Sequence, residues 1–79
     1  MTVNVLAFGI AKDIFEKSFI SFHLDGETTA DLKNSLEQQY PRLKQLTSYM
    51  VAVNNEYAQD ESILNETDEI AIIPPVSGG

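Results

Sequence analysis

The chain has 79 residues, no cysteine, and a net charge of −7 from 12 acidic and 5 basic residues. A chain of this length supports one domain of marginal stability, because it buries only about 60% of the surface that its unfolded form exposes. The composition excludes disulfides, thiol catalysis and Cys-bound zinc, and the few basic residues argue against nucleic-acid binding.

No apolar segment approaches the roughly 20 residues that cross a bilayer. Residues 1–10 also lack the basic start and the small-residue cleavage site of a signal peptide. We therefore expect a cytoplasmic protein without membrane contact. The acidic charge has two explanations, solubility or capture by a basic partner surface through electrostatic steering.

The first predicted element is a strand over residues 2–8, TVNVLAF, which is almost entirely apolar and rich in strand-forming residues. Such a run is typical of a central strand that is covered on both faces. Residues 11–17 predict a single helical turn with Ile14 and Phe15 packed inward. Residues 18–24 alternate between apolar and polar, which predicts a half-buried strand.

A helix is predicted to begin at Thr28 or Thr29, either of which is a favourable capping residue. Asp31 then lies near the positive end of the helix dipole. Pro41 predicts that the helix ends at about Tyr40. Apolar side chains recur along this segment at roughly helical spacing: Ala30, Leu32, Leu36 and Tyr40.

After this helix, Leu43 and Leu46 are expected to anchor a short irregular crossing. A third strand is predicted over residues 49–53 and a turn over residues 54–56, because asparagine tolerates the left-handed region. Residues 57–58 then predict a very short strand.

Ile63 and Leu64 are expected to lie beneath the loop that follows, and residues 69–73 predict the last strand. The first and last strands are the most apolar, which indicates central neighbours. Joining them in parallel requires a long crossover, which the helix provides. The order predicts an α+β domain of the β-grasp class, with a mixed sheet of four to five strands packed on one main helix.

The domain is predicted to span residues 1–73, and residues 74–79, PPVSGG, form an extended tail. Pro74 and Pro75 have a fixed φ and no N–H, so they stiffen the exit from the last strand. Gly78 and Gly79 lack a Cβ, so they can thread a narrow channel. Six extended residues reach at most about 20 Å, far enough to enter the active site of another protein. The alternative is an ordinary terminus without a function.

Few other side chains are candidates for a catalytic or metal-binding role. His23, the single histidine, is expected on a polar surface. The pairs Asp60–Glu61 and Asp68–Glu69 form no acid/base dyad, because adjacent residues on a strand point to opposite faces. No metal site is predicted. Five aromatic residues exceed what so small a core holds, so we expect part of them at a protein interface: Phe8, Phe19, Phe22, Tyr49 and Tyr57.

The chain resembles the ubiquitin-like sulfur carriers and, among these, the small subunits of molybdopterin synthase (the MoaD family). The resemblance covers the whole chain and rests on VNVLAFGIAKDIF at residues 3–15, VAVNNEYA at residues 51–58 and, above all, DEIAIIPPVSGG at residues 68–79. Carriers of the thiamine pathway usually lack the double proline, and ubiquitin has a more basic tail.

The resemblance implies that Gly79 is the reactive residue. An adenylyltransferase similar to ubiquitin-activating enzymes would convert its carboxylate into glycyl-AMP, and sulfur transfer would then leave a thiocarboxylate, 1-thioglycine. The tail would enter the large catalytic subunit and donate sulfur to cyclic pyranopterin monophosphate in molybdenum cofactor biosynthesis. The residues expected to contact the partner are Pro74, Pro75, Val76, Ser77 and Gly78, with Phe8 and Ile73 at the interface.

The implied assembly is a heterotetramer of two small and two large subunits, in which this chain binds no cofactor and is not catalytic alone. Two other functions stay open. The chain could be a ubiquitin-like modifier joined to lysines, or a sulfur carrier for the thiamine or tungsten-cofactor pathway.

Overall fold

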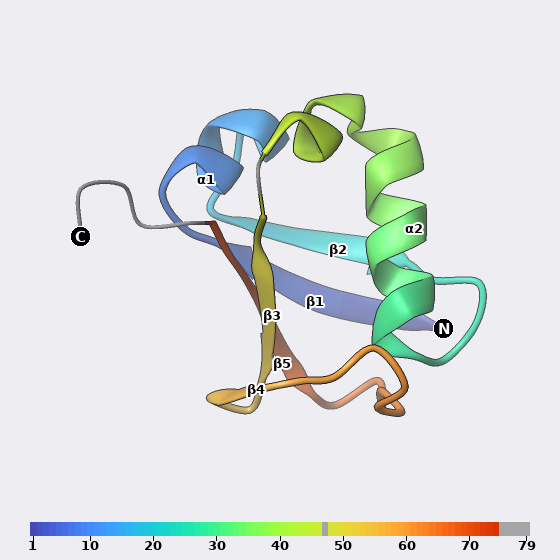
Figure 1. The fold of residues 1–79 in the computed structure, drawn as a ribbon. Helices are drawn as coiled ribbons and strands as arrows, with labels where there is room; N and C mark the ends of the chain where they lie inside the picture. Colours follow the sequence, from blue (N-terminus) through green and yellow to red (C-terminus); the bar gives the residue numbers. More distant parts are fainter. Residues whose placement is uncertain (47, 75–79) are drawn as a thin grey trace.

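The computed structural model describes residues 1–46 and 48–74, and Figure 1 shows their arrangement. In chain order the elements are β1 (Thr2–Ala7), α1 (Ile10–Phe15), β2 (Phe19–His23), α2 (Thr29–Gln39), a 3₁₀ helix η1 (Pro41–Gln45), β3 (Met50–Val53), β4 (Glu56–Tyr57) and β5 (Glu69–Ile73). Within the described ranges, neither α-helix has the length and apolar character needed to span a bilayer.

The five strands form one mixed sheet in the order β2-β1-β5-β3-β4. β1 and β5 are parallel neighbours in the centre, with Val5 opposite Ile70 and Ala7 opposite Ile72, and the other pairs are antiparallel. α2 lies across one face of the sheet (Figure 1). The predicted β-grasp class and the predicted parallel pairing of the first and last strands are confirmed.

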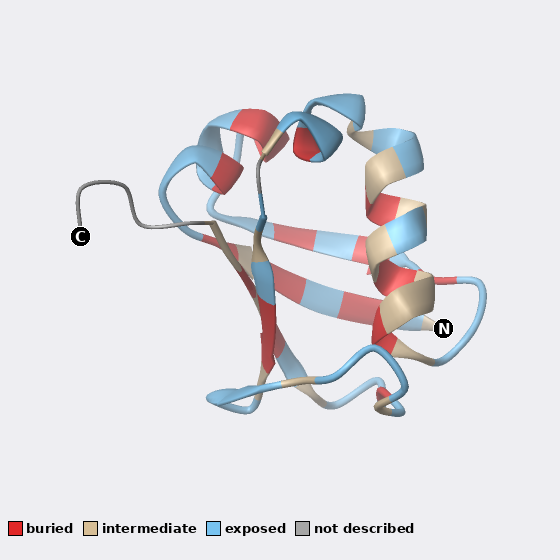
Figure 2. Ribbon diagram, in the orientation of Figure 1, coloured by how far each residue is buried: buried red, intermediate tan, exposed pale blue. Residues whose placement is uncertain are grey.

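The core lies between the sheet and the helices, and buried residues alternate along the strands (Figure 2). Val3, Val5 and Ala7 of β1 point into this core, whereas Asn4 is exposed and Leu6 is half-buried. The prediction that this strand is covered on both faces is therefore wrong. β1 is central within the sheet, but the helices cover only one side of it.

Several local predictions are confirmed. Ile14 and Phe15 of α1 are buried, and β2 alternates with Ile20 and Phe22 inward. β5 has the predicted bounds of residues 69–73.

The crossing that was predicted to be irregular is instead the 3₁₀ helix η1. It begins at Pro41, because proline suits the first turn of a helix. Its Leu43 is fully buried, as expected of an anchor.

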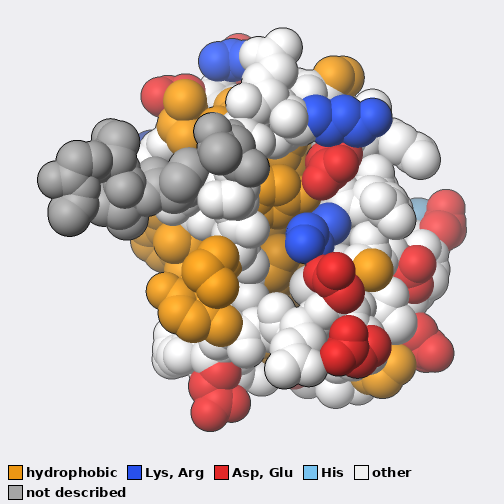
Figure 3. Space-filling view, in the orientation of Figure 1, with side chains coloured by type: hydrophobic (Ala, Val, Ile, Leu, Met, Phe, Trp, Pro, Cys, Tyr) orange, Lys and Arg blue, Asp and Glu red, His pale blue; other side chains and the backbone are white. Residues whose placement is uncertain are grey.

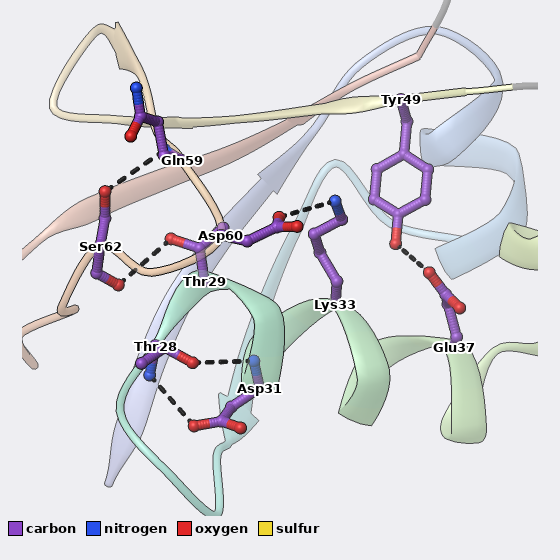
Figure 4. A network of polar contacts seen from close by, with 9 residues as sticks. All are labelled: Thr28, Thr29, Asp31, Lys33, Glu37, Tyr49, Gln59, Asp60 and Ser62. Carbon is purple, nitrogen blue, oxygen red and sulfur yellow. Dashed lines mark hydrogen bonds and ion pairs between the residues drawn. The ribbon is translucent and has the colours of Figure 1, made fainter.

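The start of α2 is held by a capping box at Thr28 and Asp31 (Figure 4). The Asp31 N–H donates to Thr28 Oγ1 over 3.1 Å, and the Thr28 N–H donates to Asp31 Oδ2 over 3.2 Å. The Glu27 N–H donates to the same carboxylate oxygen. These hydrogen bonds, chiefly those from the backbone of Thr28 and Glu27, hold the pKa of Asp31 below its usual value of 3.8.

The loop between β4 and β5 satisfies two further N–H groups at this helix end. The Thr29 N–H donates to the Ser62 carbonyl and the Ala30 N–H donates to the Asp60 carbonyl. Without these bonds the two N–H groups would have no partner within the helix.

In the loop between β4 and β5, Leu64 is buried, as predicted, but Ile63 is 56% exposed. The prediction for Ile63 is wrong because neighbouring residues of an extended segment point to opposite sides.

A second contact joins α2 to the sheet just before β3. The Tyr49 hydroxyl donates to Glu37 of α2, and the Lys33 ammonium lies 5.7 Å from the centre of the Tyr49 ring. Burial, followed by the hydrogen bond and charge of Glu37, raises the pKa of the Tyr49 hydroxyl. The tyrosine therefore stays neutral and keeps its proton as a donor.

The capping box predicts how stability depends on pH. Because the folded-state pKa of Asp31 is depressed, the ionised carboxylate stabilises the fold above its unfolded-state pKa, and this contribution disappears as pH falls through the folded-state value. We expect Asp31→Asn to lower the free energy of unfolding at neutral pH and to weaken its decrease in acid. Urea unfolding from about pH 7 to about pH 2 measures both. Glu61→Gln, which removes an exposed charge, is the control, and an equal acid dependence in both variants would contradict the assignment.

Candidate functional site

The tail leaves the sheet beside the end of β1. Because β1 and β5 are parallel, their carboxyl ends meet at one edge, where Ala7 pairs with Ile72. Phe8 and Gly9 follow β1, and Ile73 and Pro74 stand at the corresponding positions after Ile72. Pro74 is half-buried and packs near Gly9. The root of the tail therefore lies between the centre of the sheet and the loop that leads into α1.

A hollow of about 330 Å³ lies next to this root, on the sheet face opposite α2. Backbone segments of four strands and two loops contribute to it, and most of its lining side chains are apolar. The residues that line it are Leu6, Phe8, Ala52, Asn55, Tyr57, Glu69, Ala71 and Ile73. Phe8 and Ile73, the two body residues expected at an interface, line the same hollow.

The strand register extends this hollow into a larger apolar surface. Leu6 pairs with Phe19 on one side and with Ala71 on the other, and cross-strand partners share a face. Ile73 pairs with Met50. We name this surface the open apolar face; it comprises Leu6, Phe8, Phe19, Met50, Ala52, Tyr57, Ala71 and Ile73. Figure 3 shows hydrophobic side chains gathered on the side of the molecule away from α2.

Four large side chains of the open apolar face are about half exposed or more: Phe8 at 51%, Phe19 at 49%, Met50 at 49% and Tyr57 at 65%. Such a contiguous apolar group on a small soluble domain marks a contact surface. Of the five aromatic residues considered above, Phe22 belongs to the core and Tyr49 is half-buried.

The same face becomes polar toward the start of β1. Thr2, Asn4, Ser21 and His23 occupy its far half, and the Ser21 hydroxyl donates to Asn4. His23 is exposed beside Asp25, at 3.4 Å, in agreement with its predicted surface position. The apolar half of the face is thus the half adjacent to the tail.

Charge is also distributed unequally along the molecule. Four of the five basic residues lie in or directly after α1 and η1: Lys12, Lys17, Arg42 and Lys44. Most acidic residues lie instead in the segments 25–31 and 56–69. Within the described ranges, no three His, Asp or Glu side chains come together as a metal site.

The structure places only part of the predicted site. Phe8, Ile73 and Pro74 lie together at the end of the central strands, but Pro75, Val76, Ser77, Gly78 and Gly79 lie outside the described residues. The boundary between the domain and the tail stays a prediction for the same reason. Sequence reasoning missed Leu6, Met50 and Ala71 as members of the surface. Their alternation with buried neighbours along each strand was the available signal.

Truncation of two phenylalanines tests whether the open apolar face is surface or core. Phe8→Ala should cost less than about 1 kcal/mol of unfolding free energy, because the side chain is already half exposed. Phe22→Ala, the matched control in the core, should cost about 3–5 kcal/mol. Urea unfolding measures both free energies. If Phe8→Ala lowers the unfolding free energy as much as Phe22→Ala does, the open apolar face is packed rather than exposed.

Comparisons with known proteins show which family this chain resembles over its length. The profile of the ThiS family matches residues 5–79. The molybdopterin synthase sulfur carrier subunit of Dictyostelium discoideum is 42% identical over 96% of this chain and 94% of its own length.

Two solved structures share the fold and more than a quarter of the sequence. Small archaeal modifier protein 1 from Methanosarcina acetivorans has a TM-score of 0.81 and 28% identity, covering 99% of this chain and 96% of its own. The complex of subunits 1 and 2 of the molybdopterin-converting factor from Helicobacter pylori contains a chain with a TM-score of 0.67 and 26% identity, covering 100% of both chains.

Proposed function

We propose that this chain, which belongs to the ThiS family, is the sulfur carrier subunit of a molybdopterin synthase. The observation that carries the proposal is the position of PPVSGG: it follows β5 directly, and β5 borders the open apolar face. The similarity to the Dictyostelium discoideum carrier subunit over nearly the whole length of both chains supports the same function.

The chemistry takes place at the Gly79 carboxylate. A carboxylate is a poor electrophile, so attack of its oxygen on the α-phosphate of ATP, with release of pyrophosphate, forms glycyl-AMP. Hydrosulfide then attacks the carbonyl carbon, AMP leaves, and the product is a thiocarboxylate. Its sulfur is a better nucleophile than a carboxylate oxygen, and we propose that it bonds to a carbon of cyclic pyranopterin monophosphate, from which an oxygen leaving group departs. Water then cleaves the acyl–sulfur bond, so that the sulfur stays on the pterin and Gly79 becomes a carboxylate again.

The body of the domain supplies recognition. We propose that the open apolar face docks on a large catalytic subunit while the tail enters its active site, and that an adenylyltransferase uses the same tail. The H. pylori complex of subunits 1 and 2 supports a partner of this kind. The proposed assembly contains two small and two large subunits. We also propose that the protein acts in the cytoplasm.

Changes at the C-terminus test the proposed chemistry. Deletion of Gly79, or addition of residues after it, should abolish thiocarboxylate formation, since the reactive carboxyl group is removed or moved along the chain. Intact-mass analysis after incubation with ATP, an activating enzyme and a sulfur source should show replacement of one oxygen by sulfur in the wild type alone. Urea unfolding should be unchanged. An extended chain that is not trimmed and still supports product formation would contradict the proposal.

A charge placed on the open apolar face tests the proposed docking. Tyr57→Asp should weaken association with the large subunit by about tenfold or more, because a carboxylate must then be desolvated in an apolar contact. Thr2→Asp, on the polar half of the same face, is the matched control and should bind nearly as the wild type does. Calorimetric titration measures both affinities, and equal affinities would place the interface elsewhere.

A second function is favoured by the similarity to small archaeal modifier protein 1. As a modifier, the chain would pass from glycyl-AMP to an amide bond with a lysine of another protein. Conjugates linked through Gly79 without any thiocarboxylate would favour this function, whereas the thiocarboxylate without conjugates would favour the sulfur carrier. A carrier for the thiamine or tungsten-cofactor pathway would differ in its acceptor.

A further inference from the structure

Gly9 occupies a backbone conformation that requires glycine. Its φ is 56° and its ψ is −131°, outside the left-handed region that asparagine or aspartate tolerates and accessible only without a Cβ. The residue lies between β1 and α1, and its carbonyl accepts a hydrogen bond from the Lys12 N–H over 3.1 Å. This hydrogen bond ties the turn directly to the first turn of α1.

Gly9 also touches the first residue of the tail. A Cβ on Gly9 would lie 3.2 Å from Cγ of Pro74, closer than carbon atoms normally approach. The proline ring has no flexible side-chain end: its φ is fixed, and Cγ moves only through a change of ring pucker or a shift of the whole ring. An added methyl group would therefore push against the ring, which must give by a few tenths of an ångström.

Displacement of Pro74 changes the direction of the chain beyond it. The five residues that follow Pro74 span at most about 17 Å when extended, so a tilt of about 10° at the root moves the terminal carbon by up to about 3 Å. A misplacement of only about 1 Å at a reacting centre can cost about a hundredfold in rate. A small contact at the root is therefore large enough to matter at the reactive end.

We propose that Gly9 is a positioning residue for the tail: by leaving room for the Pro74 ring, it sets the direction in which the chain leaves β5. The inference rests on the proposed function, because it concerns delivery of the C-terminal sulfur. Gly9 acts through Pro74 and takes no part in the chemistry.

A double-mutant cycle tests this relation. The rate of sulfur transfer is measured in a single turnover, from thiocarboxylated carrier to acceptor, with the large subunit saturating. We expect Gly9→Ala to slow transfer about tenfold and Pro74→Ala about threefold. The double variant should be slowed by clearly less than the product of these two factors, because the clash needs both groups, whereas the backbone strain at residue 9 remains in either background. If Gly9→Ala slows transfer by the same factor in both backgrounds, the inference is wrong.

Gly26→Ala is the matched control for backbone strain. Gly26 also has a positive φ, of 113°, and a Cβ there would lie 2.5 Å from Asp31 Oδ2, at the opposite end of the molecule. The Gly26→Ala substitution should lower the unfolding free energy without slowing sulfur transfer by the folded protein. An equal slowing in Gly26→Ala would attribute the effect to lost stability and overturn the inference.

The remaining outcomes are also decisive. If Gly9→Ala does not fold, Pro74→Ala tests the contact from the other side: slower transfer with unchanged unfolding supports the inference, and an unchanged rate overturns it. A wild-type chain that transfers no sulfur would overturn the proposed function and this inference with it. An active wild type matched by an equally active Gly9→Ala would overturn the inference alone.

Discussion

The parallel hydrogen bonding of β1 with β5 determines most of what this domain presents to other molecules. Two parallel central strands require a long crossover, and α2 supplies it while covering one face of the sheet. The same pairing brings Phe8 and Gly9 beside Ile73 and Pro74, at the edge where β1 and β5 both end. The exposed face and the root of the tail are therefore consequences of one backbone arrangement.

This arrangement separates stability from reactivity. The core between α2 and the sheet uses the inward side chains of each strand, and Val5 and Ile70 are fully buried there. Their neighbours Leu6 and Ala71 are available for contact because no helix within the described ranges covers them. The proposed reactive group lies beyond the last strand, so the packing of the core does not constrain its chemistry.

Much of the fold could be predicted because it depends on local patterns. The apolar run of β5 gave its bounds, and the residue types at Thr28 and Asp31 indicated the start of α2. The open side of β1 could not be predicted, because an apolar run looks the same whether one face is covered or two. The contact of Gly9 with Pro74 joins residues far apart in sequence, and it depends on strand register, which a local pattern does not determine.

Because β1 and β5 run in the same direction, the chain starts and departs at opposite ends of the sheet. The Met1 ammonium donates to the Leu24 carbonyl at one end, and Pro74 lies at the other. Six strand residues separate these ends by about 20 Å, whereas many domains have neighbouring termini. An affinity tag or a surface linkage attached ahead of Met1 would thus be remote from Pro74, and a circular permutation would need a linker that spans the whole sheet.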